Sequence, residues 1–102
     1  MSVMVIIEFP GATVEKFMAV YDRHKETMAA ISADGRSKGA IHHMFVENGN
    51  GELMVVDEWG SFEEFEAFFG SQEDIKTIMD EVGVTGAPKP VSYRVVDSPD
   101  RF

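Results

Sequence analysis

Four short apolar runs alternate with two longer segments of helical periodicity. Residues 3–9, 40–47, 52–59 and 91–96 are rich in β-branched and other apolar side chains, which predicts strands. The segments between them repeat hydrophobic residues every three or four positions, which is typical of one face of a helix. The order strand, helix, strand, strand, helix, strand predicts an α+β, ferredoxin-like domain with its helices on one face of the sheet.

The first helical segment is expected to be one long helix. Pro10 and Gly11 are expected to end the strand before it, and Thr13 is a suitable N-cap. Its apolar stripe consists of Val14, Phe17, Tyr21, His24, Met28 and Ile31. The polar sequence that follows, SADGRSKG at 32–39, predicts a loop.

The second helical segment begins with a capping-box pattern. Ser61 is followed three residues later by Glu64, which is typical of a helix start. Its first part carries a cluster of aromatic residues: Phe62, Phe65, Phe68 and Phe69. After Gly70 we expect a restart at Ser71, and Gly83 fits a helix end. The stripe of this second part is Ile75, Ile78, Met79 and Val82.

The sequence NGNG at 48–51 predicts a tight hairpin turn, because Asn and Gly tolerate positive φ angles. A loop of two or four residues would place His42 opposite Asp57 and His43 opposite Val56. That pairing puts four side chains on one face of the hairpin: His42, Met44, Asp57 and Trp59. A shift of one residue would separate His42 from Asp57, and the sequence leaves open which face of 40–47 lines a pocket.

Both faces of the predicted sheet are apolar. In the first strand, for example, Val5 and Ile7 point one way while Met4 and Ile6 point the other. The helices can cover only one face, and soluble monomers rarely expose an apolar patch above roughly a few hundred Å². A symmetric homodimer is therefore predicted.

Composition narrows the classes of function. A chain of 102 residues is expected to be a single domain spanning 1–102. Its net charge of −9 disfavours nucleic acid and anionic membranes as partners, and the absence of cysteine excludes disulfides and thiolate chemistry. The start MSVMVIIEF has no basic leader and is too short to span a bilayer, so a cytoplasmic location is expected.

The layout resembles the dimeric α+β barrel superfamily and, within it, the antibiotic-biosynthesis-monooxygenase-like domains. The similarity extends from residue 3 to about 96. Its most specific part is VVDEWGSFEEFEAFF, where a strand ending in Trp59 runs through Ser61 into an aromatic-rich helix. The resemblance implies two four-stranded sheets that close into a barrel across a homodimer, and a pocket in each subunit between helices and sheet. Members include cofactor-free oxygenases of polycyclic phenols, haem-degrading enzymes and isomerases.

The chain departs from this family at three positions. The oxygenases and haem-degrading members often use an asparagine on the first strand, and a tryptophan and a histidine on the helices after the third. The corresponding places here hold Glu8 or Phe9, Phe68 or Phe69, and Ile78 or Met79. That triad is therefore not carried over, and Trp59 matches only a structural tryptophan of the family.

The histidines are the candidate catalytic residues. An imidazole beside a carboxylate is held in one tautomer and is made more basic, as a general base requires. His42 oriented by Asp57 is the first candidate, and His24, expected to face a pocket beside Tyr21, is the second. The residues predicted to line the ligand site are Tyr21, Met44, Trp59, Phe65 and Phe69. The spacing of His24, His42 and Asp57 matches no metal motif, so neither a metal nor a cofactor is expected.

Three functions remain open at this point. The first is a pocket that holds a small apolar or aromatic molecule, with His42 as acid/base or hydrogen-bond donor. The second is a cofactor-independent monooxygenase, in which His42 or His24 deprotonates a phenolic or quinone substrate. The third alternative is a ligand-free structural or regulatory homodimer with a filled core. A cavity larger than one water molecule would separate the first two from the third.

Overall fold

The structure is a computed structural model that describes all residues, 1–102. Its elements are β1 Val3–Thr13, α1 Val14–Arg23, α2 Lys25–Ser37, β2 Ala40–Glu47, β3 Glu52–Trp59, α3 Phe62–Ser71, α4 Glu73–Val82 and β4 Lys89–Arg94. None of the helices combines the length and the apolar character that crossing a membrane requires. The order of the elements confirms the α+β, ferredoxin-like class predicted from the sequence.

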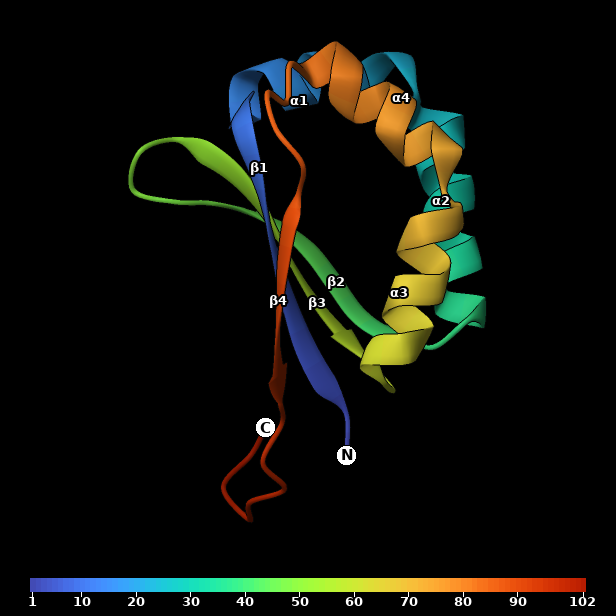
Figure 1. Ribbon diagram of the computed structural model, residues 1–102, viewed down its shortest axis with the longest axis vertical. Helices are drawn as coiled ribbons and strands as arrows, with labels where there is room; N and C mark the ends of the chain where they lie inside the picture. The colour runs from blue at the N-terminus through green and yellow to red at the C-terminus, as the bar shows by residue number, and fades with distance from the viewer.

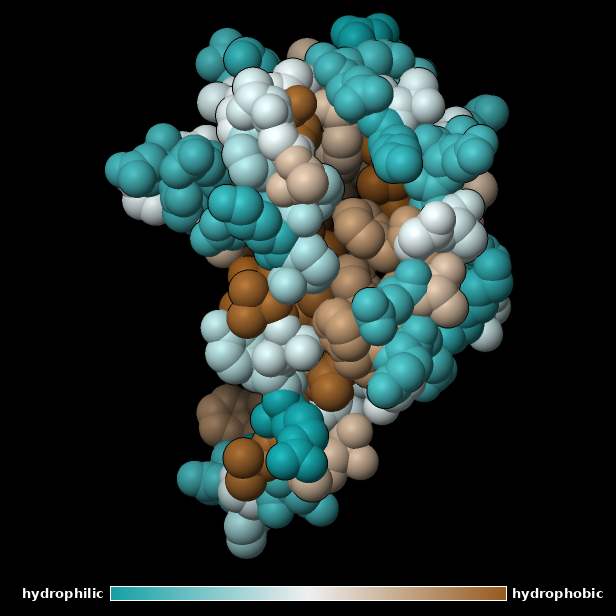
Figure 2. Space-filling model, in the orientation of Figure 1, coloured by the Kyte–Doolittle hydropathy of each residue, from teal (hydrophilic) through white to brown (hydrophobic).

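The four strands form one antiparallel sheet in the order β2-β3-β1-β4. All helices lie on the same side of this sheet, and its other side carries none (Figure 1). Hydrophobic side chains, brown in Figure 2, gather between sheet and helices, whereas the outer helix surfaces are mainly hydrophilic. The fold therefore has two layers and one uncovered sheet face.

The hydrophobic core lies between the two layers. Its largest fully buried side chains are Trp59, Phe65, Leu53, Ile78, Val5 and Val82. Burial of each such side chain contributes about 1.5–3 kcal/mol relative to its exposure. Because β1 and β3 are the central strands, their inward-facing residues hold the sheet against α3 and α4.

The first helical segment is two helices and not the single helix predicted. α1 ends at Arg23, His24 adopts φ −126° and ψ 28°, and α2 begins at Lys25. The backbone N–H of His24 donates to the Tyr21 carbonyl at 2.9 Å and closes α1. The sequence has neither glycine nor proline at this point, so the hydrophobic periodicity alone gives no sign of the break.

α2 also extends further than predicted, to Ser37 and through most of the expected loop at 32–39. Gly35 is buried within it, and a Cβ there would lie only 3.4 Å from Cζ of Phe68. Glycine lowers helix stability by up to about 1 kcal/mol relative to alanine, so its local preference favours a loop. The close contact between α2 and α3 outweighs that preference and fixes the side chains of the last turns.

The Pro-Gly pair at 10–11 bends β1 instead of ending it. The strand continues to Thr13, with an irregular register between Glu8 and Thr13. Gly11 has φ +83°, and a Cβ there would lie 2.8 Å from the side chain of Thr85. Only glycine meets both requirements, which is typical of a bulged strand.

The ends of the later helices follow local capping chemistry. The Ser61 hydroxyl accepts from the Glu64 N–H at 3.2 Å and donates to the Glu64 carboxylate at 3.0 Å, which confirms the predicted cap of α3. α4 ends at Gly83 in the left-handed conformation, φ +95°, also as predicted. The restart differs, because Ser71 belongs to α3 and Gln72 precedes α4.

The loop between β2 and β3 has three residues, 49–51, inside the closing pair Asn48 and Glu52. The Asn48 N–H donates to the Glu52 carbonyl at 3.0 Å. The Asn48 side-chain oxygen accepts from the N–H groups of Asn50 and Glu52, and Gly51 adopts φ +79°. Three-residue loops with a left-handed residue are common in hairpins. The expected loop of two or four residues is therefore wrong, and the strand register shifts by one residue.

The shifted register changes the partners of both histidines. β2 and β3 begin and end where predicted, but His43 lies opposite Asp57 and His42 lies opposite Glu58. The predicted pairing of His42 with Asp57 is wrong. Because side chains alternate along a strand, a shift of one residue also exchanges the faces. His43 points toward the helices, and His42 points to the uncovered side.

The uncovered side of the sheet, called here the open face, is largely apolar. Its apolar residues, placed by the strand register and the alternation of side chains, are Met4, Ile6, Met44, Val46, Met54, Val56, Val91 and Tyr93. Met44, Val91 and Tyr93 are 50%, 49% and 56% exposed. The expectation that both faces of the sheet are apolar is therefore confirmed.

Candidate functional site

A cavity of about 310 Å³ lies between the sheet and the helices. The strands β1, β2 and β3 form its floor, and α2, α3 and α4 form its walls. Most of its lining is hydrophobic, and the structure places Trp59, Phe65 and Phe69 in it. A single water needs roughly 10–15 Å³, and ligand pockets measure about 300–1,000 Å³. The cavity is thus large enough for a small organic molecule, and a filled core does not describe this protein.

Two of the residues predicted to line the ligand site lie elsewhere. Tyr21 and Met44 border a second hollow, which adjoins the cavity and shares with it Met28, Ser32, His43 and Phe45. The break between α1 and α2 separates Tyr21 from the cavity, and the shifted register turns Met44 to the open face.

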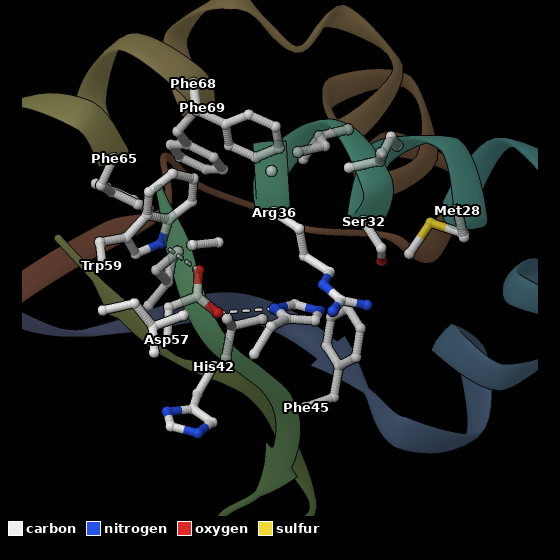
Figure 3. A pocket seen from close by; sticks show the side chains of 18 of the residues that line it. Met28, Ser32, Arg36, His42, Phe45, Asp57, Trp59, Phe65, Phe68 and Phe69 are labelled. Carbon is white, nitrogen blue, oxygen red and sulfur yellow. Dashed lines mark hydrogen bonds and ion pairs between the residues drawn. The ribbon is translucent and has the colours of Figure 1, made fainter. Parts of the chain in front are cut away.

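His43 and Asp57 form a partly buried hydrogen-bonded pair at the cavity. Nδ1 of His43 lies 2.7 Å from Oδ1 of Asp57, and Nε1–H of Trp59 donates to Oδ2 at 3.0 Å. Figure 3 marks both interactions with dashed lines. Asp57 is only 6% exposed, so both of its oxygens are satisfied inside the protein. An ionised carboxylate only accepts hydrogen bonds, so this pairing requires Nδ1 of His43 to donate, and in the neutral ring Nε2 then has a free lone pair.

The His43 ring is accessible although its partner is buried. Its side chain is 41% exposed and lines the cavity. Phe45 packs edge-on against it, with ring centroids 4.9 Å apart. The ring is therefore held by Asp57 on one nitrogen and by Phe45 on its surface, and Nε2 can exchange a proton with a bound molecule.

His42 belongs to a second polar group. Its Nδ1 lies 2.8 Å from Oε1 of Glu58, whose carboxylate also accepts from the hydroxyl of Ser2 and the guanidinium of Arg101. The Ser2 and His42 hydrogen bonds and the Arg101 charge hold the pKa of Glu58 below its ordinary value, although burial opposes them. His42 borders the cavity, but its ring points away (Figure 3). The sequence thus predicted a His–carboxylate pair on these strands, but Asp57 pairs with His43 and not with His42.

His24 does not line the cavity, so the expectation that it faces the pocket is wrong. Its Nε2 lies 3.1 Å from the Glu81 carboxylate of α4, which also accepts from Arg23 at 3.2 Å. The hydrogen bonds from His24 and Arg23 hold the pKa of Glu81 below its ordinary value. His24 therefore ties the α1–α2 joint to α4. No cluster of three or more His, Cys, Asp or Glu side chains is placed to hold a metal ion.

Arg36 is a cavity residue that the sequence reading missed. Its side chain extends from α2 toward the cavity in Figure 3. Met28, Ser32 and Arg36 follow one another at intervals of four residues along α2, which places them on one helix face. The spacing places Arg36 among the cavity residues only when α2 continues through 32–37, where the sequence predicts a loop.

Comparisons with known proteins place the fold. No protein-family model matches the sequence, and no curated protein matches it. The monooxygenase ActVA-Orf6 of Streptomyces coelicolor, solved with nanaomycin D, superposes with a TM-score of 0.63 and 18% identity over 97% of this chain and 92% of its own. SnoaB, a cofactor-independent oxygenase from Streptomyces nogalater, superposes with a TM-score of 0.59 and 10% identity over 98% of this chain and 97% of its own.

A dimeric protein of unknown function from Bacteroides fragilis, with a ferredoxin-like fold, gives a TM-score of 0.60 and 16% identity over 92% of this chain and 96% of its own. At sequence identities this low, the comparisons show the fold alone. The structural side of the resemblance seen in the sequence is confirmed, because several neighbours are antibiotic-biosynthesis monooxygenases or proteins assigned to that class. The chain has the ferredoxin-like α+β fold of antibiotic-biosynthesis-monooxygenase-like proteins.

Proposed function

We propose that this protein binds a small, mostly aromatic molecule in the cavity and that His43, oriented by Asp57, acts on it as a general acid/base. The observation that carries this proposal is the meeting of a His–carboxylate pair with an apolar cavity of about 310 Å³. Aromatic walls from Trp59, Phe65 and Phe69 favour a flat ring system, because burial of apolar surface contributes roughly 25 cal/mol per Å².

The pair supports proton transfer at one defined atom. Nε2 of His43 takes a proton from an acidic O–H or C–H group of the ligand, and the ring becomes an imidazolium. Asp57, 2.7 Å from Nδ1, stabilises that positive charge. Trp59 fixes Asp57 through the 3.0 Å hydrogen bond and so keeps the imidazole in one orientation. His43 replaces His42 in the role expected from the sequence.

A more specific candidate is cofactor-independent monooxygenation of a phenolic or quinol-type substrate. Two structural neighbours are a monooxygenase and a cofactor-independent oxygenase, which supports this choice. His43 would remove a proton from a CH₂ group between aromatic rings, the carbanion would form a C–O bond with dioxygen, and the imidazolium would return its proton to the resulting peroxide. Removal of the second C–H proton with cleavage of the O–O bond would then release the carbonyl and hydroxide, and hydroxide would take up that second proton as water. One substrate and one O₂ are consumed, and the substrate supplies all the electrons.

The assembly that fits this fold is a homodimer through the open face. The apolar residues of that face include side chains about half exposed, such as Met44 and Val91. A second copy would remove them from water on both partners at once. The dimeric Bacteroides fragilis protein shares the fold, which supports a homodimer. Two sheets would then face each other, with the helices outside.

The only tryptophan makes the proposal directly testable. Trp59 lies in the cavity wall, so its fluorescence should change when 2-naphthol binds. Wild-type protein should bind 2-naphthol more tightly than its methyl ether, because only the naphthol has an O–H that donates to Nε2 of His43. His43→Gln should reduce that preference and keep most of the binding. His42→Gln is the matched control, since its ring points away from the cavity. Failure of 2-naphthol to bind, or an equal loss in both variants, refutes the proposal.

Oxygen consumption tests the more specific candidate. Wild-type protein with anthrone or a fused hydroquinone should consume one O₂ per anthrone oxidised, without added flavin, haem or metal. His43→Gln should lower this rate by roughly 10²- to 10⁴-fold, the usual contribution of a general base. If no substrate of this panel raises oxygen uptake above the buffer rate, the monooxygenase assignment fails, while ligand binding stands on its own measurement.

A further inference from the structure

We propose that the ligand of the cavity carries a carboxylate and that Arg36 binds it, so that the protein selects aromatic acids. This inference rests on the proposed function, namely that the cavity holds an aromatic molecule. It adds the chemical class of the ligand and the residue that determines it.

Arg36 brings a cation to an otherwise apolar lining. It is the only lysine or arginine that borders either the cavity or the adjoining hollow. In Figure 3 its guanidinium reaches from α2 toward the cavity, while Trp59 and the phenylalanines of α3 lie together at the other end. A ligand between them would place its ring against the aromatic group and its polar end beside Arg36.

The Arg36 guanidinium has no partner in the protein. None of the side-chain hydrogen bonds or ion pairs of the chain includes it. The carboxylate of Asp34, two residues away, already accepts from Lys38 at 3.0 Å and from Gln72 at 2.8 Å. Asp57, the carboxylate within the cavity lining, uses both of its oxygens for His43 and Trp59. Arg36 is thus a free cation in a protein of net charge −9.

The chemistry of the guanidinium indicates a carboxylate. Arginine stays protonated at all physiological pH values, and its planar donors match two carboxylate oxygens at once. One guanidinium balances one carboxylate, whereas a phosphate monoester would bring close to two negative charges to this single cation. The apolar walls would leave the second charge uncompensated.

The overall acidity of the protein does not prevent this binding. At physiological ionic strength, charges more than about 8 Å apart in water are largely screened. The charges nearest the ligand therefore determine whether an anion binds, and in the cavity lining these belong to Arg36 and to the His43–Asp57 pair. Because Arg36 is exposed, water weakens the ion pair, and the expected preference for an acid is modest.

A pair of isosteric probes tests the inference. Binding of 2-naphthoate and of the neutral 2-naphthamide is measured by Trp59 fluorescence at pH 7.5. Wild-type protein should bind the acid roughly two- to fivefold more tightly than the amide. Arg36→Gln should remove this preference by weakening the acid alone, and Arg36→Lys should keep part of it. Arg94→Gln is the matched control, because this exposed arginine of β4 does not border the cavity.

The outcomes separate this inference from the proposed function. Equal affinities for acid and amide in the wild type, or an unchanged preference in Arg36→Gln, overturn the role of Arg36 and leave aromatic binding intact. Binding of neither probe overturns both. Circular dichroism of each variant shows whether a loss of binding comes from unfolding, and the unchanged affinity expected for the amide in Arg36→Gln gives a second check of folding.

Discussion

Replacement of Met44 by aspartate should break the proposed homodimer. Met44 lies on the open face in a row of paired residues that crosses all four strands, with Val56, Ile6 and Val91. This row is entirely apolar, and Met44 is 50% exposed in the single chain. In a dimer formed through this face, the exposed half would be covered by the partner copy.

The expected loss of dimer affinity follows from the exposed half of the Met44 side chain. Complete burial of a methionine side chain contributes roughly 1.5–3 kcal/mol, so burial of the remaining half contributes about 1 kcal/mol per copy. A symmetric dimer contains the residue twice, which gives about 2 kcal/mol, or a weakening of at least roughly 30-fold. An aspartate without a partner in the interface adds the unfavourable desolvation of its charge. Met44→Asp should therefore be monomeric at micromolar concentration.

Met18 provides a closely matched control. It is the same residue type, is 47% exposed and lies on α1, outside the open face. Met18→Asp changes the net charge of the chain by the same amount as Met44→Asp, so a difference between the two variants reports position and not charge.

Sedimentation equilibrium at protein concentrations from about 1 to 100 µM measures the outcome, because association depends on concentration. Wild type and Met18→Asp should have twice the chain mass of 11.4 kDa, and Met44→Asp should have the mass of one chain. Thermal unfolding by circular dichroism confirms that both variants fold. A wild-type mass of one chain, or equal dissociation of both variants, would show that the open face does not bind a second copy.

Three further predictions concern the stability of the single chain. Glu58→Gln removes a carboxylate whose pKa is lowered mainly by the Ser2 and His42 hydrogen bonds. The stability that this carboxylate provides is present above its ordinary pKa of 4.5, and it is lost as pH falls through the lower pKa of the folded state. Urea unfolding should therefore show a wild-type advantage over Glu58→Gln at pH 7 that shrinks below pH ~4.5; a gap that widens on acidification contradicts this. Phe65→Ala empties a site that is 2% exposed beside Trp59 and should lower the free energy of unfolding by about 3–5 kcal/mol, and a loss under ~1 kcal/mol would mean that the aromatic cluster is loosely packed. Gly51→Ala should lose about 1 kcal/mol from its φ of +79°, whereas Gly49→Ala, equally free of neighbours within 4 Å, should stay within about 0.5 kcal/mol; equal effects would exclude backbone strain as the cause.

Much of the fold was predictable because it follows local chemistry. The caps at Thr13, Ser61 and Gly83 depend on side chains or φ angles within a few residues, and the pattern of the sequence identifies them. The bounds of β2 and β3 were predictable for the same reason, since the Asn-Gly turn and the apolar runs mark both ends. Both apolar faces of the sheet also follow directly from the alternation of side chains.

The site was predictable in kind but not in detail. Two histidines and two acids on neighbouring strands indicated a hydrogen-bonded pair, but the partner of each depends on the length of the loop, and both even and odd lengths are compatible with NGNG. Arg36 was missed because Gly35 and its polar neighbours favour a loop locally. In the structure, residues distant in sequence contact that stretch: Phe68 packs beside Gly35, and Gln72 donates to Asp34.

The three-residue turn has a consequence for relatives of this chain and for redesign. Deletion or insertion of one residue at 49–51 that shifts the register by one would exchange the two faces of one strand relative to the other, while every amino acid of both strands stays in place. Asp57 would lose His43 and would lie opposite His42 or Met44 instead. No residue of this surface loop lines the cavity, yet variants of its length should be among the most damaging changes to the site. Substitutions that preserve its length and Gly51 should be mild.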